Sequence, residues 1–241
     1  MMRYLKGVLI ATLLAAGSAS GQNLDNLQTL SQQQFRLLSE DLGGGLSYRP
    51  QTPTEPLGFP GFDLGIGVTS VKLENTAIFQ QASSESVDST LLVPTLRANV
   101  GLPLGFDIGV LYASVPDSDI RYYGGEVRFA IVRGDSVTPA IGLRGSFTKM
   151  EGVDQLDLDT RGLDLSISKG FGFITPYAGI GKVWVDSEPK GVAAVTLSKE
   201  EFTLNKWFAG VGMNFAGLNV NLEADKTGDV KAYSLKLGLR F

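Results

Sequence analysis

The sequence predicts an all-β protein, a transmembrane antiparallel up-and-down β-barrel of about ten strands with a short N-terminal helix. From Phe62 onward, apolar and polar residues alternate in about ten short segments with turn residues between them. The connections between these segments are alternately short and long. After about residue 21, no stretch approaches the roughly eighteen consecutive apolar residues that a membrane-spanning helix requires.

Each expected strand has an apolar side and a side of small or polar residues, because successive side chains of a strand point to opposite faces. In the first strand, Phe62, Leu64 and Ile66 alternate with Asp63 and Gly65. The expected strands cover residues 62–73, 91–102, 106–112, 123–131, 141–148, 163–168, 174–185, 206–215, 218–224 and 233–241.

One of these strands, 174–185, has an ambiguous alternation. Either Ala178 and Ile180 or Val183 and Val185 face outward, and a β-bulge would reconcile the two patterns.

The connections fall into two classes. Short turns are expected near 103–105, 133–138, 169–173 and 216–217, and longer or more polar connections at 74–89, 115–120, 150–156, 186–200 and 226–229. This alternation is typical of an antiparallel barrel whose two chain ends lie on the same side of a membrane. A strand of about ten residues, tilted by about 45°, covers roughly 24 Å, which is close to the height of the apolar band of such barrels.

Aromatic residues lie near the ends of the expected strands, where amphipathic rings suit a membrane–water interface. They are Phe62, Phe106, Tyr112, Tyr123, Phe147, Trp184, Trp207, Phe215, Tyr233 and Phe241. Each of them alone would also fit the core of a soluble barrel, so only their joint distribution favours a membrane.

Residues 1–21 are predicted to be a cleaved secretory signal peptide. Arg3 and Lys6 precede an apolar run over 8–16, and small residues follow over 17–21. The run is too short to span a bilayer as a helix, which takes about twenty residues. The chain has no Cys and therefore neither a lipid attachment site nor a disulfide.

Residues 22–60 do not follow the barrel pattern, which covers 61–241. Leucines recur near helical spacing and predict an amphipathic helix over about 23–42. Glycines 43–45 are expected to stop this helix, and the Pro-bearing stretch 50–60 is expected to be a linker or an extended segment. The helix would lie in the periplasm, rest on the membrane or plug the barrel. Alternatively, residues 42–48 would add a further strand.

The last strand indicates the location of the protein. Its apolar face resembles the closing strand of bacterial outer-membrane β-barrels, which their assembly machinery reads as a folding signal. This face holds Tyr233, Leu235, Leu237, Leu239 and Phe241. The edge strand of a soluble sandwich is the alternative.

The sequences GFDIGV at 105–110 and TPYAG at 175–179 extend this resemblance to an uncharacterised family of small outer-membrane barrels. The resemblance implies a place in the bacterial outer membrane, among lipid and lipopolysaccharide. It also implies the barrel assembly machinery and periplasmic chaperones as partners.

Charged residues of both signs are expected on the lumen side of the strands. The candidates are Asp63, Arg97, Asp107, Glu126, Arg128, Arg144, Asp164, Lys206, Glu223, Lys236 and Arg240. Opposing rows of acids and bases would line a narrow pore and set its ion preference. They would equally form a salt-bridged interior, because the lumen of a small barrel is largely filled by side chains and buried ions must pair.

Catalytic and metal chemistry is limited by the absence of both His and Cys. Ser–His, Cys–His and imidazole–metal arrangements are impossible, and the outer-membrane barrel enzymes, such as the omptin proteases, rely on a catalytic His. We therefore expect no catalytic site, no cofactor and no metal site. The acidic loop with Glu151, Asp154, Asp157 and Asp159 lacks the spacing of a calcium-binding EF-hand and is expected to be solvated.

These observations predict a non-enzymatic, porin-like barrel that passes small solutes or ions through a narrow lumen. The alternative is a closed structural or adhesion barrel that acts through its extracellular loops. Without residues 1–21, 19 basic side chains face 25 acidic ones. This acidic balance argues against binding to nucleic acid, which requires a basic surface.

Overall fold

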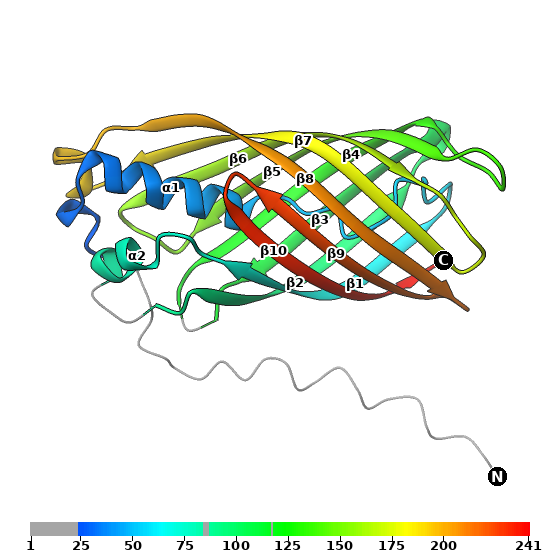
Figure 1. The fold of residues 1–241 in the computed structure, drawn as a ribbon, viewed down its shortest axis with the longest axis horizontal. Helices are drawn as coiled ribbons and strands as arrows, with labels where there is room; N and C mark the ends of the chain where they lie inside the picture. The colour runs from blue at the N-terminus through cyan, green and yellow to red at the C-terminus, as the bar shows by residue number, and fades with distance from the viewer. Residues whose placement is uncertain (1–23, 84–86, 117) are drawn as a thin grey trace, which may run out of the picture.

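The computed structural model of the chain describes residues 24–83, 87–116 and 118–241, so the predicted signal peptide lies outside the described residues. Ten antiparallel strands form a closed up-and-down barrel (Figure 1), which confirms the predicted fold class. The strands are β1 Phe62–Lys72, β2 Thr90–Gly101, β3 Phe106–Ser114, β4 Arg121–Val132, β5 Ala140–Glu151, β6 Leu156–Ser168, β7 Ile174–Pro189, β8 Glu200–Phe215, β9 Leu218–Thr227 and β10 Val230–Arg240.

The barrel closes between its first and last strands. β1 pairs with β10 in a register that runs from Asp63↔Arg240 to Lys72↔Lys231, and every other strand pairs with its neighbours in the sequence. The chain enters β1 and leaves β10 at the end of the barrel that carries the short turns. We call this the turn end, and we call the opposite end, with the longer connections, the loop end.

The outer face of the barrel is apolar around its circumference. The ten aromatic residues predicted for the strand ends are all exposed. Strand β7 needs no bulge, since Ala178 and Ile180 face outward and Val183 and Val185 are buried inside. Exposed apolar side chains on all sides are what a barrel surrounded by lipid requires.

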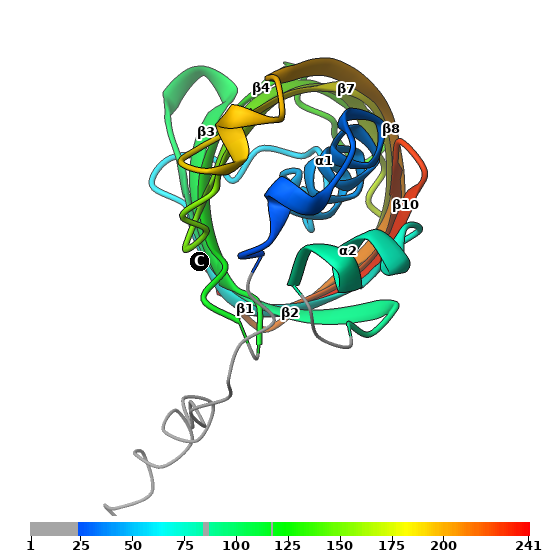
Figure 2. The same ribbon diagram turned by 90° about the vertical axis from the view of Figure 1, so that its left-hand side faces the viewer.

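The N-terminal region is helical and lies inside the ring of strands, as the view along the barrel axis shows (Figure 2). It contains a short 3₁₀ turn η1, Leu27–Thr29, and the helix α1, Gln32–Leu46. Ser31 caps α1 in a reciprocal capping box with Gln34, which fixes where the helix starts. None of the helices in the described part of the chain is long and apolar enough to cross a membrane.

Three expectations for this region are wrong. The helix was expected to begin at about residue 23, but only the turn η1 precedes Ser31 and α1 begins at Gln32. Helix α1 continues through glycines 43–45, which were expected to end it, so residues 42–46 are helical and add no strand. The reason is tertiary, because these glycines face the barrel wall at close range. A Cβ on Gly43 would lie 2.6 Å from Val185 Cγ2, and one on Gly44 would lie 2.8 Å from the Thr227 carbonyl oxygen.

The connections at the loop end also carry structure. The 74–89 connection contains the helix α2, Thr76–Ser83, where only a loop was expected. The 186–200 connection contains a 3₁₀ turn η3, Ala193–Val195. Both lie across the mouth of the barrel beside the N-terminal region (Figure 2).

Candidate functional site

The lumen is occupied along its length by residues 24–57, which we call the plug. Its contacts with the wall follow one another from the loop end to the turn end. Near the loop end, Gln32 Nε2 donates to Glu200 Oε1 at 2.5 Å. Near the turn end, the Leu57 amide donates to Asp107 Oδ1 at 3.1 Å. The plug therefore runs antiparallel to β1, which begins at Phe62 and returns to the loop end.

The first part of the plug forms an apolar cap with the loop-end helices. Leu27, Phe35 and Leu38 of the plug have no exposed surface, and Ala82 of α2 and Ala193 of η3 belong to the same buried cluster. The loops at this end are thereby joined to the plug in one small hydrophobic core. An ordered core of this kind makes the loop end a defined surface.

Asp41 ties helix α1 to the connection that follows β1. Its carboxylate accepts from the backbone amides of Glu74 at 3.0 Å and Asn75 at 2.8 Å, and from Asn75 Nδ2 at 3.1 Å. A further side-chain contact joins the helix to the wall, where the hydroxyl oxygens of Ser39 and Ser187 lie 2.7 Å apart.

Arg49 forms the central ion pair between plug and wall. Its Nε lies 2.7 Å from Asp225 Oδ1, and the exposed fractions of the two side chains are 2% and 0%. The same guanidinium donates to the carbonyl oxygens of Gly45 at 2.7 Å and Gly44 at 3.1 Å. It thus neutralises a buried carboxylate and also satisfies the carbonyls left free at the end of α1.

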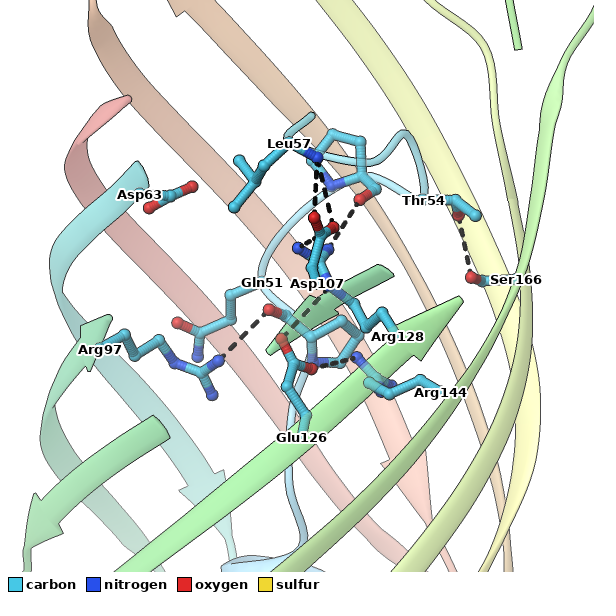
Figure 3. A network of polar contacts seen from close by, with 12 residues as sticks. Gln51, Thr54, Leu57, Asp63, Arg97, Asp107, Glu126, Arg128, Arg144 and Ser166 are labelled. Carbon is cyan, nitrogen blue, oxygen red and sulfur yellow. Dashed lines mark hydrogen bonds and ion pairs between the residues drawn. The ribbon is translucent and has the colours of Figure 1, made fainter. Parts of the chain in front are cut away.

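The last part of the plug, residues 48–57, has no regular secondary structure and offers backbone carbonyls to cations of the wall (Figure 3). Arg97 Nη1 donates to the Pro50 carbonyl at 3.3 Å, and Arg128 Nη1 donates to the Pro53 carbonyl at 3.2 Å. Lys206 Nζ donates to the carbonyl of Tyr48. Prolines suit these positions because they have an acceptor but no amide donor that would need its own buried partner.

Polar groups of the wall, chiefly carboxylates, accept hydrogen bonds from the N–H and O–H donors of the plug. Glu223 Oε2 accepts from the Gln51 amide at 2.8 Å and from the Tyr177 hydroxyl at 2.9 Å. The Thr54 hydroxyl donates to Ser166 Oγ at 2.9 Å. The wall therefore matches the plug with cations against carbonyls and carboxylates against amides.

The structure brings the charged residues proposed for the lumen together inside the barrel. Ten of the eleven are buried, and Arg240 is half-buried. Arg128 contacts Asp107 at 3.0 Å and Glu126 at 3.4 Å, and Lys236 contacts Asp63 at 2.5 Å. Further ion pairs link Arg144 with Asp164 and with Glu126.

Sequence reasoning missed the residues that join the plug to this network, chiefly Arg49, Gln51 and Asp225. Asp225 had a usable signal, because it continues the inward alternation of Asn219, Asn221 and Glu223 in β9, a strand expected to end at residue 224. Arg49 and Gln51 had none, because they lie in a stretch without periodicity.

Two small cavities lie beside the plug. A cavity of about 40 Å³ near the loop end is lined mostly by apolar residues of α1, α2, β1, β2 and the connections that follow β1 and β3. Another of about 20 Å³ lies near the turn end beside Pro53 and Arg128, and the two share no lining residue. Each is large enough for at most a few water molecules.

At the loop end, charged side chains pair on the surface. The hydrogen bond with Asp186, together with one to Glu201, raises the pKa of Lys199. Of the acidic residues expected in a loop at 151–159, Asp157 and Asp159 lie in strand β6. Asp157 pairs with Lys190 at 3.1 Å. Among the described residues, no cluster of acidic side chains is arranged to hold a metal ion.

Comparisons with known proteins found likenesses of architecture alone. No family model and no curated protein matches it. The solved structures that resemble it are outer-membrane β-barrel proteins. The β domain of the Bordetella autotransporter BrkA is 11% identical with a TM-score of 0.44, over 75% of this chain and 98% of that one.

Two further structures show a similar degree of likeness. The N-terminal barrel domain of Pseudomonas aeruginosa OprF is 12% identical with a TM-score of 0.36, over 74% of this chain and 97% of that one. The KdgM porin in complex with disordered oligogalacturonate is 7% identical with a TM-score of 0.38, over 74% and 99%. These identities and TM-scores give no information about the lumen contacts described above.

Proposed function

We propose that this protein is a non-enzymatic barrel of the bacterial outer membrane that is closed by its own plug and acts at the cell surface. The observation that carries the proposal is the occupation of the lumen from end to end by residues 24–57, held by buried ion pairs and hydrogen bonds. A barrel filled in this way is a rigid support for the surface at its outer end.

The membrane location is supported by the outer face. Apolar side chains are exposed on every strand, and most of the exposed aromatic residues lie near strand ends, with Trp207 in the middle of β8 as an exception. Outer-membrane lipid and lipopolysaccharide are the proposed surroundings. The alternating strand β10, together with Phe241 that follows it, is the proposed signal for the barrel assembly machinery. That machinery would receive the chain from periplasmic chaperones.

A surface role is supported by the apolar cap. Helices α2 and η3 share a core with the plug, so the loop end has a definite shape with which a structural or adhesive partner would interact. Passage of small solutes or ions, the other role considered from the sequence, would require residues 24–57 to leave the lumen.

The experiment is single-channel recording with the refolded protein, residues 22–241, in planar bilayers. We expect no conductance steps from protein whose folding is verified by its heat-modifiable mobility in gels. Regular steps from folded protein would overturn the proposed closure and would favour passage through the lumen.

A further inference from the structure

The course of the plug places the N-terminal residues of the described chain at the loop end of the barrel. Four contacts fix the order along the axis. From the loop end they are Gln32–Glu200, Ser39–Ser187, Arg49–Asp225 and Leu57–Asp107. Leu24 to Thr29 precede all of them. The N-terminal segment and the C-terminus of the chain therefore lie at opposite ends of the barrel (Figure 1).

The first residues of the plug are anchored in the loop-end cap. Leu24 and Leu27 are buried, and the Asn26 amide donates to the Ala82 carbonyl of α2 at 2.8 Å. Gln155, in the connection between β5 and β6, donates to the carbonyl of Asp25. The side chains of Asp25 and Thr29 are exposed beside these anchors. This segment is thus part of the loop-end surface.

The loop end is the external end under the proposed membrane placement. In outer-membrane barrels the short turns face the periplasm and the longer connections face outward. A chain that is exported with its N-terminus first and ends with that segment at the loop end must have carried the segment across the membrane. The plug and β1 form the two arms of a hairpin whose bend, residues 58–61, stays at the turn end.

We propose that the barrel delivers its own N-terminal segment through its lumen to the outside, where residues 24–30 form part of the external face. The transported molecule is thus a polypeptide segment of the chain itself. This segment crosses the membrane beside β1 and is fixed in the lumen when β1 pairs with β10. The inference rests on the proposed outer-membrane location and not on the absence of conductance.

The polar interior is suited to a crossing polypeptide. An extended chain in a lumen must have its amides and carbonyls satisfied by the wall, because little water remains there. Arg97 and Arg128 supply donors to plug carbonyls, and Glu223 accepts from a plug amide. The wall thus substitutes for the water that a polypeptide would otherwise keep.

Cysteine labelling in intact bacterial cells tests this proposal, because the chain has no Cys of its own. The probe is a maleimide on a polyethylene glycol too large to pass through outer-membrane pores. Three variants of the full chain are compared: D25C in the plug, V195C at η3 and V137C in the turn-end connection between β4 and β5. Val195 and Val137 are 85% and 83% exposed and serve as matched controls for the two sides.

We expect D25C and V195C to shift on gels after labelling of intact cells, and V137C to shift only after the outer membrane is permeabilised. Labelling of D25C only after permeabilisation, while V195C reacts in intact cells, would overturn the delivery of the N-terminal segment. Labelling of V137C but not V195C in intact cells would show that the turn end faces outward. The N-terminal segment would then lie at the periplasmic end, which would also overturn the proposal. Neither result would change the conductance measured for the proposed closure.

Discussion

The guanidinium of Arg49 shows how one side chain can hold the plug in a lumen. It pairs with Asp225 in a region from which solvent is excluded and also covers two carbonyls at the end of α1. Removing one partner of a buried pair leaves the other charge without compensation, which costs far more than the loss of a surface pair. The stability of the plug is therefore concentrated in a few such residues.

We expect R49M to lower the free energy of unfolding by about 3–5 kcal/mol, because Asp225 would remain buried without its cation. The control is R36M, in helix α1 of the same plug. Arg36 pairs with Glu40 and Glu200 in a partly exposed position, and its loss should cost less than about 1 kcal/mol. Urea unfolding in lipid vesicles measures both, and equal effects of the two substitutions would contradict the central role of Arg49.

At the scale of elements, helix α1 depends on how near it approaches the wall. Glycines 43–45 would weaken an isolated helix, yet in the barrel they allow the helix to pass β7 and β9 without a clash. Their effect is uneven, because a Cβ on Gly44 would clash with a backbone carbonyl, whereas a Cβ on Gly45 would make an ordinary van der Waals contact with Val71. The same glycine run therefore holds two positions with opposite expected responses.

We expect G45A to be neutral or to stabilise the protein by up to about 1 kcal/mol, since alanine favours the helix and its Cβ would lie 3.5 Å from Val71 Cγ1. We expect G44A to destabilise it by about 1–3 kcal/mol, because the new Cβ would lie 2.8 Å from the Thr227 carbonyl oxygen. Thermal unfolding of the two variants decides this. The opposite order would mean that α1 does not pack against the wall as described.

For the whole molecule, the question is whether plug and wall form one body in the membrane. The Ser39 and Ser187 hydroxyls lie 2.7 Å apart although 148 residues separate them in the chain. The Thr148 and Thr160 hydroxyls, at 2.6 Å, join two neighbouring wall strands. One pair thus reports on the plug and the other on the barrel alone.

We expect both S39C/S187C and T148C/T160C to form a disulfide on mild oxidation in the membrane, because each pair is already in contact. Non-reducing gels, with and without prior reduction, detect the cross-link. A cross-link in T148C/T160C but not in S39C/S187C would show that the barrel is folded while the plug lies elsewhere.

The barrel could be predicted because its signals are local. Alternation along each strand, aromatic residues near strand ends such as Tyr112, and the lengths of connections all depend on neighbouring residues. The prediction was wrong at Trp207, which lies in the middle of β8 because that strand begins at Glu200. The candidate lumen residues followed from the same alternation. Helix α1 was predicted for the same reason, but both of its ends were misplaced, because it spans Gln32–Leu46 and not about 23–42. The local pattern indicated a stop at glycines 43–45 and does not contain the wall against which these glycines pack.

The position of residues 24–57 required the folded structure. Arg49 lies 176 residues from Asp225 in the chain, and Gln51 lies 172 residues from Glu223. A partner at such a distance leaves no periodic mark in the residues around it, so a free helix, a surface helix and a plug all have the same sequence pattern. Only closure of the barrel brings those carboxylates around the segment, and the burial of matched charges then holds it inside.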